Sequence, residues 1–351
     1  MTFQEAIRKI EPIDEACRKR AQARLDRLTK PVGSLGRLEA LAARYVAMTR
    51  EERPKVPRAA IFTFAADHGV ANEGVSAYPS AVTAQMVLNF LRGGAAVNVL
   101  ASHVGAEVLV VDIGVAYEFG PLPNLISRKV AKGTKNFAHE PAMSREEAIK
   151  ALEVGIELAA QARQRGVGLI GTGDMGIGNT TPSAAITSVM TGQSVASVTG
   201  RGTGVDEAGL SRKVTVIERA LARHRPDSGD PLDVLTKVGG LEIAGLAGLI
   251  LGAAAHRVPV VLDGFIAGAA ALIAAGFQPR CCEYLIASHR SVERGHQAAL
   301  DRLGLVPLLD LDLRLGEGTG ACLGISLIQA SIKILTQMAT FEEAGVSERE
   351  T

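Results

Sequence analysis

Short apolar runs alternate along the chain with longer segments in which apolar residues recur at helical spacing. Continuous apolar runs are typical of strands buried on both faces of a parallel sheet, because helices cover both sides. Strands that alternate with helices predict α/β architecture. We therefore expect a doubly wound, mostly parallel sheet, with strands over 59–66, 107–113, 167–170, 258–262 and 284–287.

The intervening segments predict helices, of which 144–165 is the best marked because Ser144 and Glu147 form a capping box. We expect the helices of both chain ends to pack together over the carboxyl edge of the sheet. This divides the chain into a small helical domain (1–50 plus 319–351) and an α/β domain (51–318). Further helices are expected over 3–28, 35–48 after a Ser34 N-cap, 82–100 with a break at Gly93-Gly94, 206–223 and 240–255.

Composition narrows the class of protein. The 351 residues are 47% hydrophobic but only 4% aromatic, which suits a large aliphatic core. A net charge of +1 gives no electrostatic case for binding nucleic acid or an anionic membrane. The four cysteines show no CxxC spacing, and the charged N-terminus lacks the apolar core of a signal peptide. We expect a soluble, cytoplasmic protein.

Polar residues follow two of the predicted strands directly. Asp67-His68-Gly69 follows the first strand, and Asp263-Gly264 follows the fourth. Ligands of open α/β sheets bind just outside the carboxyl ends of the strands. Asp67 and His68 therefore form either a site pair or a hydrogen-bonded turn.

Two glycine clusters suit an anion. Residues 171–176 satisfy the GxGxxG pattern of dinucleotide-binding folds after a strand. That pattern also requires an acidic residue about 20 positions further on to hold the ribose, and residues 185–205 contain none. Asn179 and Thr180 then precede a helix, which suits a single phosphate or ribose hydroxyls. The second cluster, 199–204, precedes a helix whose Arg212-Lys213 pair either binds an anion or forms a solvated face.

Glu317 is a carboxylate flanked by Gly316 and Gly318 at the start of an apolar helix. Such a residue either complements the helix dipole or belongs to a site. His289, Glu293 and His296 do not match a metal-ligand spacing, so no metal is expected.

Seven motifs occur together and in order: PVGSLGRLE, ADHGV…GVSAYPSAVT, GDMGIGNTT, GRGTGVDEAGLSRK, DGFIAGAAAL, SHRSVERGH and RLGEGTGA. The chain thereby resembles the nicotinate-nucleotide:dimethylbenzimidazole phosphoribosyltransferase family over nearly its whole length. The resemblance implies transfer of the phosphoribosyl group from nicotinate mononucleotide to 5,6-dimethylbenzimidazole. The products are nicotinate and α-ribazole 5′-phosphate, which is used for the nucleotide loop of cobalamin.

The resemblance and the chemistry together assign roles to residues. Glu317 is expected to be the general base, and Asp174 is a second catalytic candidate, where the family often has the longer Glu. No metal or redox cofactor is needed, and a homodimer is expected. Phosphate and ribose are assigned to Gly176, Gly178, Asn179, Thr180, Gly202, Gly204, Lys213, Asp263, Gly264 and Ser291, and the base to Tyr78, Ser80 and Leu88.

Two other functions are weighed against this one. An NAD-dependent oxidoreductase would use the GxGxxG segment, and a non-catalytic nucleotide-binding sensor would use the glycine clusters without needing Glu317. Release of nicotinate from the mononucleotide separates both alternatives from a phosphoribosyltransferase.

Overall fold

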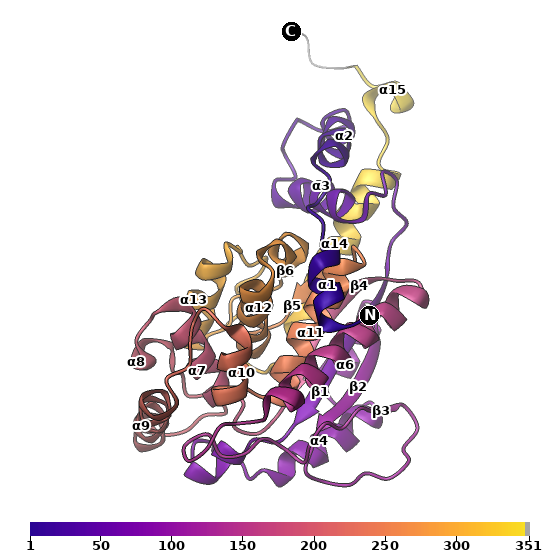
Figure 1. Ribbon diagram of the computed structural model, residues 1–351. Helices are drawn as coiled ribbons and strands as arrows, with labels where there is room; N and C mark the ends of the chain where they lie inside the picture. The colour runs from indigo at the N-terminus through magenta and orange to yellow at the C-terminus, as the bar shows by residue number, and fades with distance from the viewer. Residues whose placement is uncertain (348–351) are drawn as a thin grey trace.

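Six parallel strands form one sheet in the computed structural model, which describes residues 1–347 (Figure 1). The sheet order is β3-β2-β1-β4-β5-β6, so the chain reverses its direction of winding between β1 and β4. A crevice opens at such a point, at the carboxyl edge of the sheet. The strands are β1 Arg58–Ala66, β2 Glu107–Gly114, β3 Leu125–Ser127, β4 Val167–Met175, β5 Val260–Leu262 and β6 Leu285–Ala287.

The doubly wound α/β fold and its five predicted strands are confirmed. The sequence did not predict β3, whose three residues pair only with β2 at the edge of the sheet and are not fully buried. The strand predicted over 167–170 is longer in the structure, because β4 continues through Gly171–Met175 instead of ending at Ile170. Most of the GxGxxG segment is therefore strand.

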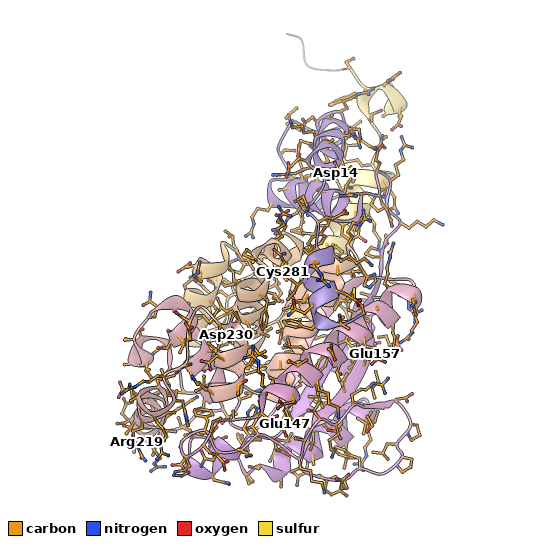
Figure 2. All side chains as sticks on the ribbon, viewed as in Figure 1. Asp14, Glu147, Glu157, Arg219, Asp230 and Cys281 are labelled. Carbon is orange, nitrogen blue, oxygen red and sulfur yellow. The ribbon has the colours of Figure 1, made fainter. Side chains whose placement is uncertain are left out.

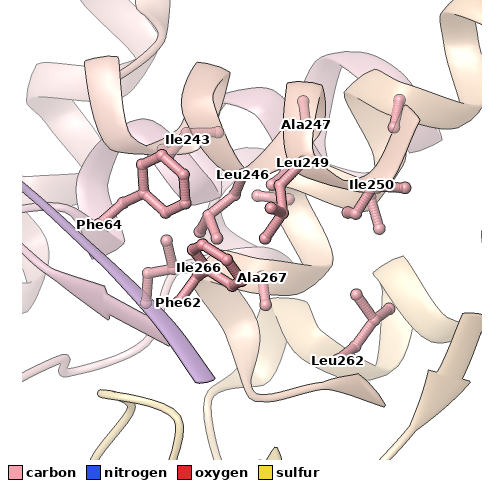
Figure 3. Close-up of a cluster of buried hydrophobic side chains, with 14 of the residues drawn as sticks. Phe62, Phe64, Ile243, Leu246, Ala247, Leu249, Ile250, Leu262, Ile266 and Ala267 are labelled. Atoms are coloured by element: carbon pink, nitrogen blue, oxygen red, sulfur yellow. The ribbon is translucent and has the colours of Figure 1, made fainter. Parts of the chain in front are cut away.

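Side chains of β1 alternate between the two faces of the sheet. Phe62 and Phe64 pack against α11 (Leu241–Ala255), as Figure 3 shows. Ile61 and Thr63 point to the other face, toward the start of α14 (Thr319–Gln337). Because both faces of the sheet are covered at β1, the sequence of this strand is a nearly continuous apolar run.

The predicted capping box at Ser144 and Glu147 is confirmed, and the helix predicted over 82–100 is interrupted as expected. The single helix predicted over 3–28 is wrong, because Pro12 separates two helices. Ser34 is not an N-cap, since Gly36 holds that position. The remaining helices are α1 Phe3–Lys9, α2 Glu15–Asp26, α3 Arg37–Thr49, η1 Gly69–Glu73, α4 Ala81–Leu91, α5 Ala96–His103, α6 Arg145–Gln164, α7 Thr180–Thr191, α8 Val195–Val198, α9 Glu207–His224, α10 Pro231–Val238, α12 Phe265–Phe277, η2 Pro279–Tyr284, α13 Arg294–Leu303 and α15 Phe341–Ala344.

Helices α6 and α11 pack with their backbones in direct contact. A Cβ on Gly155 would overlap the Gly245 carbonyl oxygen, and a Cβ on Gly248 would overlap the Leu152 carbonyl oxygen. Glycine at these positions allows the close approach. The Gly/Ala-rich α11 is completely buried by this packing.

Helices α2 and α3 and the end of α14 enclose a second, smaller core (Figure 1). The prediction that these helices cover the carboxyl edge of the sheet is wrong. The Tyr45 hydroxyl of α3 donates to the Gly168 carbonyl at the start of β4, at 3.2 Å, so the cluster contacts the opposite, amino edge. In Figure 2, Asp14 of this cluster and Arg219 of α9 lie at opposite ends of the molecule. The small core contains Cys17, Ala21, Leu25, Leu28, Ala42, Ala43, Val46 and Leu335.

Helix α14 explains this placement. Nineteen helical residues span about 28 Å, close to the length of the nine-residue strand β4. A helix that begins at the carboxyl edge therefore reaches the amino edge, where α14 contacts α2 and α3. By length and composition α14 could span a membrane, but 56% of the tested window is buried in the protein, as in a core helix. Helix α1 packs on α6 and α11 rather than in the small core, and the two-domain division stays a prediction.

Candidate functional site

A cavity of about 490 Å³ lies at the carboxyl edge of the sheet. Its walls come from the ends of β4 and β5, from the start of α7 and from the loops around 202, 290 and 314. The sequence placed these segments far apart in the chain, and the sheet brings them together. The predicted residues that line the cavity are Tyr78, Asp174, Asn179, Thr180, Gly202, Gly264 and Ser291.

Glu317 follows directly on the cavity-lining residues Leu315 and Gly316. Its φ is +65°, and its neighbours Gly316 and Gly318 have φ values of +83° and +104°. A side chain in this region is strained, and glycine would fit better. This backbone strain makes Glu317 a candidate functional residue.

The main chain at Glu317 is fixed from both sides. The Thr63 hydroxyl donates to the Glu317 carbonyl at 3.0 Å. Asp263 accepts the Gly318 amide at 3.0 Å and the Gly320 amide at 2.7 Å. Asp263 was expected to line the ribose. It does not line the cavity; it binds the free amides at the start of α14 instead.

The Glu317 carboxyl group has no hydrogen bond or ion pair among residues 1–347, although only 7% of the residue is exposed. Burial, with a smaller contribution from the charge of Asp263, raises its pKa to about 7. The amides at the start of α14 are accepted by Asp263 and not by Glu317, so Glu317 does not cap this helix. At neutral pH the group can both accept and release a proton.

Asp174 presents one oxygen of its carboxyl group without a partner. Its Oδ2 accepts the Asn179 side-chain amide at 2.9 Å, whereas Oδ1 is buried with no hydrogen bond in the described chain. Burial and then the charges of Asp263 and Glu242 raise the pKa of Asp174 well above its usual range. A carboxyl group in this setting favours its neutral form and can donate a hydrogen bond into the cavity.

Lys213 is completely buried, so the alternative of a solvated helix face is wrong for this residue. Its Nζ donates to the Thr180 hydroxyl at 2.5 Å, at the N-terminus of α7. A Cβ on Gly202 would lie 3.3 Å from the same Nζ. The ammonium group therefore lies directly behind two residues of the cavity wall. The exposed Arg212 instead donates to the Gly74 carbonyl.

Ser80 and Leu88 line a second cavity of about 660 Å³, together with Asp67 and His68. Because Tyr78 lines the first cavity and is only two residues from Ser80, the 78–80 segment lies between the two. The expected base-binding residues are thus divided between two cavities.

The side chains of Asp67 and His68 bind residues far away in the sequence rather than forming a local turn. Asp67 accepts the Ala116 amide at 2.8 Å, as in a loop contact. His68 Nε2 lies 2.8 Å from Glu242 Oε1 in a buried pair. Asp67 and His68 also line the second cavity.

Two glycines of the first cluster allow neighbouring backbone segments to approach closely. A Cβ on Gly173 would overlap the Glu317 carbonyl oxygen, so this glycine makes room for the catalytic candidate. A Cβ on Gly176 would lie 2.5 Å from the Ala66 carbonyl oxygen at the end of β1. Gly178 has a φ of +92° and Gly204 one of +109°, and neither lines the cavity. Of the 176–180 loop, only Asn179 and Thr180 line the cavity.

Sequence reasoning missed Glu293 and Arg314, which both line the first cavity. Glu293 was considered only as a metal ligand, although it lies in one of the recognised motifs. Its Oε1 accepts the Gly202 amide at 2.9 Å, so this amide already has a partner. Within residues 1–347 no group of three or more His, Cys, Asp or Glu side chains is arranged to hold a metal ion.

Comparison with known proteins gives a consistent result. A family model described as Phosphoribosyltransferase matches residues 10–346. A nicotinate-nucleotide–dimethylbenzimidazole phosphoribosyltransferase of Geotalea uraniireducens is 62% identical over 348 residues, which is 99% of each chain. Its counterpart from Roseiflexus is 63% identical over 98% of this chain and 97% of the relative. The crystal structure of CobT from Thermus thermophilus is 50% identical, with a TM-score of 0.91 over 95% of this chain and 100% of that one.

The parallel sheet, with its glycine-rich loops and buried lysine beside a cavity, and the matching family model define an α/β phosphoribosyltransferase. Within that class, the chain belongs to the nicotinate-nucleotide–dimethylbenzimidazole phosphoribosyltransferase family.

Proposed function

We propose that the protein transfers the 5-phosphoribosyl group of nicotinate mononucleotide to 5,6-dimethylbenzimidazole, which gives α-ribazole 5′-phosphate and nicotinate. The family membership supports this reaction and its place in assembly of the cobalamin nucleotide loop. The structural observation that carries it is Glu317, a buried carboxyl group beside the cavity whose pKa is raised to about 7.

The reaction needs one proton acceptor. The lone pair of one benzimidazole nitrogen forms a bond to C1′ of the ribose, and the bond between C1′ and the nicotinate nitrogen breaks. Its electron pair returns to the pyridine ring, so nicotinate leaves as a stable anion without an acid. The proton on the other benzimidazole nitrogen passes to Glu317. General-base assistance of this kind contributes about 10²–10⁴-fold.

Phosphate is assigned to the 176–180 loop, to the 202–204 turn and to Ser291, with Lys213 as the cation behind them. Asn179, Thr180, Gly202 and Ser291 are the members of this set that line the cavity. The N-terminus of α7 supports this assignment, because Asn179 and Thr180 line the cavity there. Ribose is assigned to Gly264 at the end of β5, with Asp263 acting through the α14 backbone. Asp174, which also lines the cavity, is assigned a hydrogen bond to the reacting nucleotide.

The flat base is assigned to the 78–88 segment. Tyr78 reaches the first cavity, while Ser80 and Leu88 line the second. Leu88 offers apolar surface where some relatives of the family carry Gln, so the segment is expected to govern which base is accepted.

The test mixes nicotinate mononucleotide with 5,6-dimethylbenzimidazole and follows nicotinate and the new nucleoside phosphate by chromatography. Base-dependent release of nicotinate, in one-to-one ratio with product, supports the proposal. A change in NAD(H) absorbance without nicotinate release would favour an oxidoreductase. Tight nucleotide binding without turnover would favour a sensor.

We further propose that the protein works in the cytoplasm as a homodimer. The cysteines support the first part, since Cys17, Cys281, Cys282 and Cys322 are all unpaired. Family resemblance supports the second.

A further inference from the structure

The Glu293 carboxyl group lies against the turn to which phosphate binding is assigned. Its Oε1 accepts the Gly202 amide at 2.9 Å, and its Oε2 is buried with no hydrogen bond in the described chain. A Cβ on Gly200 would overlap this carboxyl group. The turn therefore encloses Glu293 closely, and any side chain at position 200 would displace it.

Lys213 contacts the same turn. Besides the Thr180 hydroxyl, its Nζ donates to the Gly200 carbonyl at 3.3 Å. Both acceptors are neutral, and a buried ammonium group with neutral partners tends to lose its proton. Burial lowers the pKa of Lys213 to about 8, and the charge of Glu293 opposes this shift.

Other charged groups around Lys213 have partners elsewhere or are basic. Helices α7 and α8 pack on α9 but carry no titratable side chain. The cavity is also lined by the basic His289 and Arg314 and by two other acids, Asp174, which binds the Asn179 side-chain amide, and the exposed Asp312. Of the three acids, only Glu293 contributes to the pKa of Lys213. On the neighbouring turn and helices, Arg201 pairs with Glu207, Lys237 with Asp233, and Arg212 binds the Gly74 carbonyl.

We propose that Glu293 is a positioning residue of the phosphate subsite: it fixes the 199–204 turn through the Gly202 amide and supplies the counter-charge that keeps the buried Lys213 protonated before the nucleotide binds. This inference rests on the proposed function, because it takes Lys213 as the cation that binds phosphate. Glu293 acts through Lys213 and the turn, not on the reacting atoms.

The test variant is Glu293→Gln, which keeps an oxygen for the Gly202 amide and removes the charge. The KM for nicotinate mononucleotide is measured from pH 6.5 to 9. Loss of the counter-charge should move the rise in KM to lower pH. If the shift is one pH unit, KM at pH 8 should increase by up to about tenfold, while KM at pH 6.5 changes little. The effect should fall on KM rather than on kcat.

The control repeats the comparison in a protein that carries Lys213→Arg, because a guanidinium stays protonated over this pH range. In that background, adding Glu293→Gln should no longer change the pH dependence of KM. Superimposed profiles for the parent and Glu293→Gln would overturn the proposal. So would an equal pH-dependent loss in the Lys213→Arg background.

A second readout does not depend on turnover. The Lys213 ammonium is titrated by NMR in the nucleotide-free protein with ¹³C-labelled lysine, and its signal is assigned by its loss in Lys213→Arg. Glu293→Gln should lower the midpoint. An unchanged midpoint refutes the role of Glu293 whether or not the protein is active. A lowered midpoint in a protein that does not release nicotinate refutes only the proposed function.

Discussion

Asp263 acts on Glu317 both through the backbone and through its charge. It binds the amides of Gly318 and Gly320, which sets the main-chain position of Glu317, and its negative charge contributes to the raised Glu317 pKa. Asp263→Asn should therefore lower this pKa. The acidic limb of the profile of kcat against pH, expected near pH 7 in the parent, should move to lower pH.

Thr63→Val is the control for this prediction. It removes the hydrogen bond to the Glu317 carbonyl but leaves the charge of Asp263 in place. Its kcat should fall without movement of the acidic limb. If Asp263→Asn also leaves the limb near pH 7, Asp263 affects Glu317 only through the backbone.

Glu317→Gln keeps size and shape but removes the base. We expect kcat to fall by 10²-fold or more, on the scale of general-base catalysis, with mononucleotide binding within a few-fold of the parent. Steady-state kinetics and calorimetric binding measure the two quantities. A fully active variant would remove Glu317 from the chemistry.

The same variant should be more stable than the parent at high pH. The pKa of Glu317 is about 7 in the folded protein and 4.5 ordinarily, so folding favours its protonated form. That stabilising contribution is complete below pH 4.5 and is lost as pH rises through 7. Glu317→Gln should thus raise the thermal midpoint at pH 8 but not at pH 4.5. The corresponding gain in the free energy of unfolding at pH 8 is on the order of 3 kcal/mol at most. A lower midpoint at pH 8 would indicate a structural glutamate.

Lys213→Met should weaken binding of the mononucleotide. A hydrogen bond to a charged group is worth about 1.5–3 kcal/mol, which corresponds to about 10- to 150-fold in KM. Arg212→Gln is the matched control, because Arg212 is adjacent but exposed and binds the Gly74 carbonyl. Equal KM values for Lys213→Met and the parent would exclude the lysine from the phosphate site.

Gly248→Ala should destabilise the fold, because the added methyl group would overlap the Leu152 carbonyl between α11 and α6. Overpacking of this kind costs about 1–3 kcal/mol. Gly229→Ala serves as the control, since only the Asp227 side chain lies near its Cβ position, at 3.3 Å. Chemical denaturation of both variants measures the difference. Equal stabilities would show that the two helices can separate at little cost.

A homodimer should have about twice the 36.7 kDa mass of the chain. The Gly/Ala-rich helices α11 and α12 are buried within the subunit, so the contacts of a dimer would lie elsewhere. Light scattering at micromolar concentration measures the mass, and a monomer would contradict the prediction.

The sequence predicted the sheet well because a buried parallel strand leaves a local signal, an apolar run followed by a polar loop. It singled out Glu317 for a similar reason, since a charged residue between glycines before an apolar helix is locally unusual. Lys213 gave a misleading signal, because its burial depends on α7 and the 199–204 turn folding over it. Glu293 lies in a recognised motif, but its contact could not be predicted, because the Gly202 amide that it accepts is 91 residues away.

Helix α14 contributes residues to both hydrophobic cores of the protein. One end of this helix begins two residues after Glu317, and the other end contributes Leu335 to the small core at the far edge of the sheet. Because a helix is a stiff element, a displacement of Leu335 should be carried along α14 to its start, next to Glu317. We therefore expect that substitutions in the small core alter turnover although they do not contact the cavity.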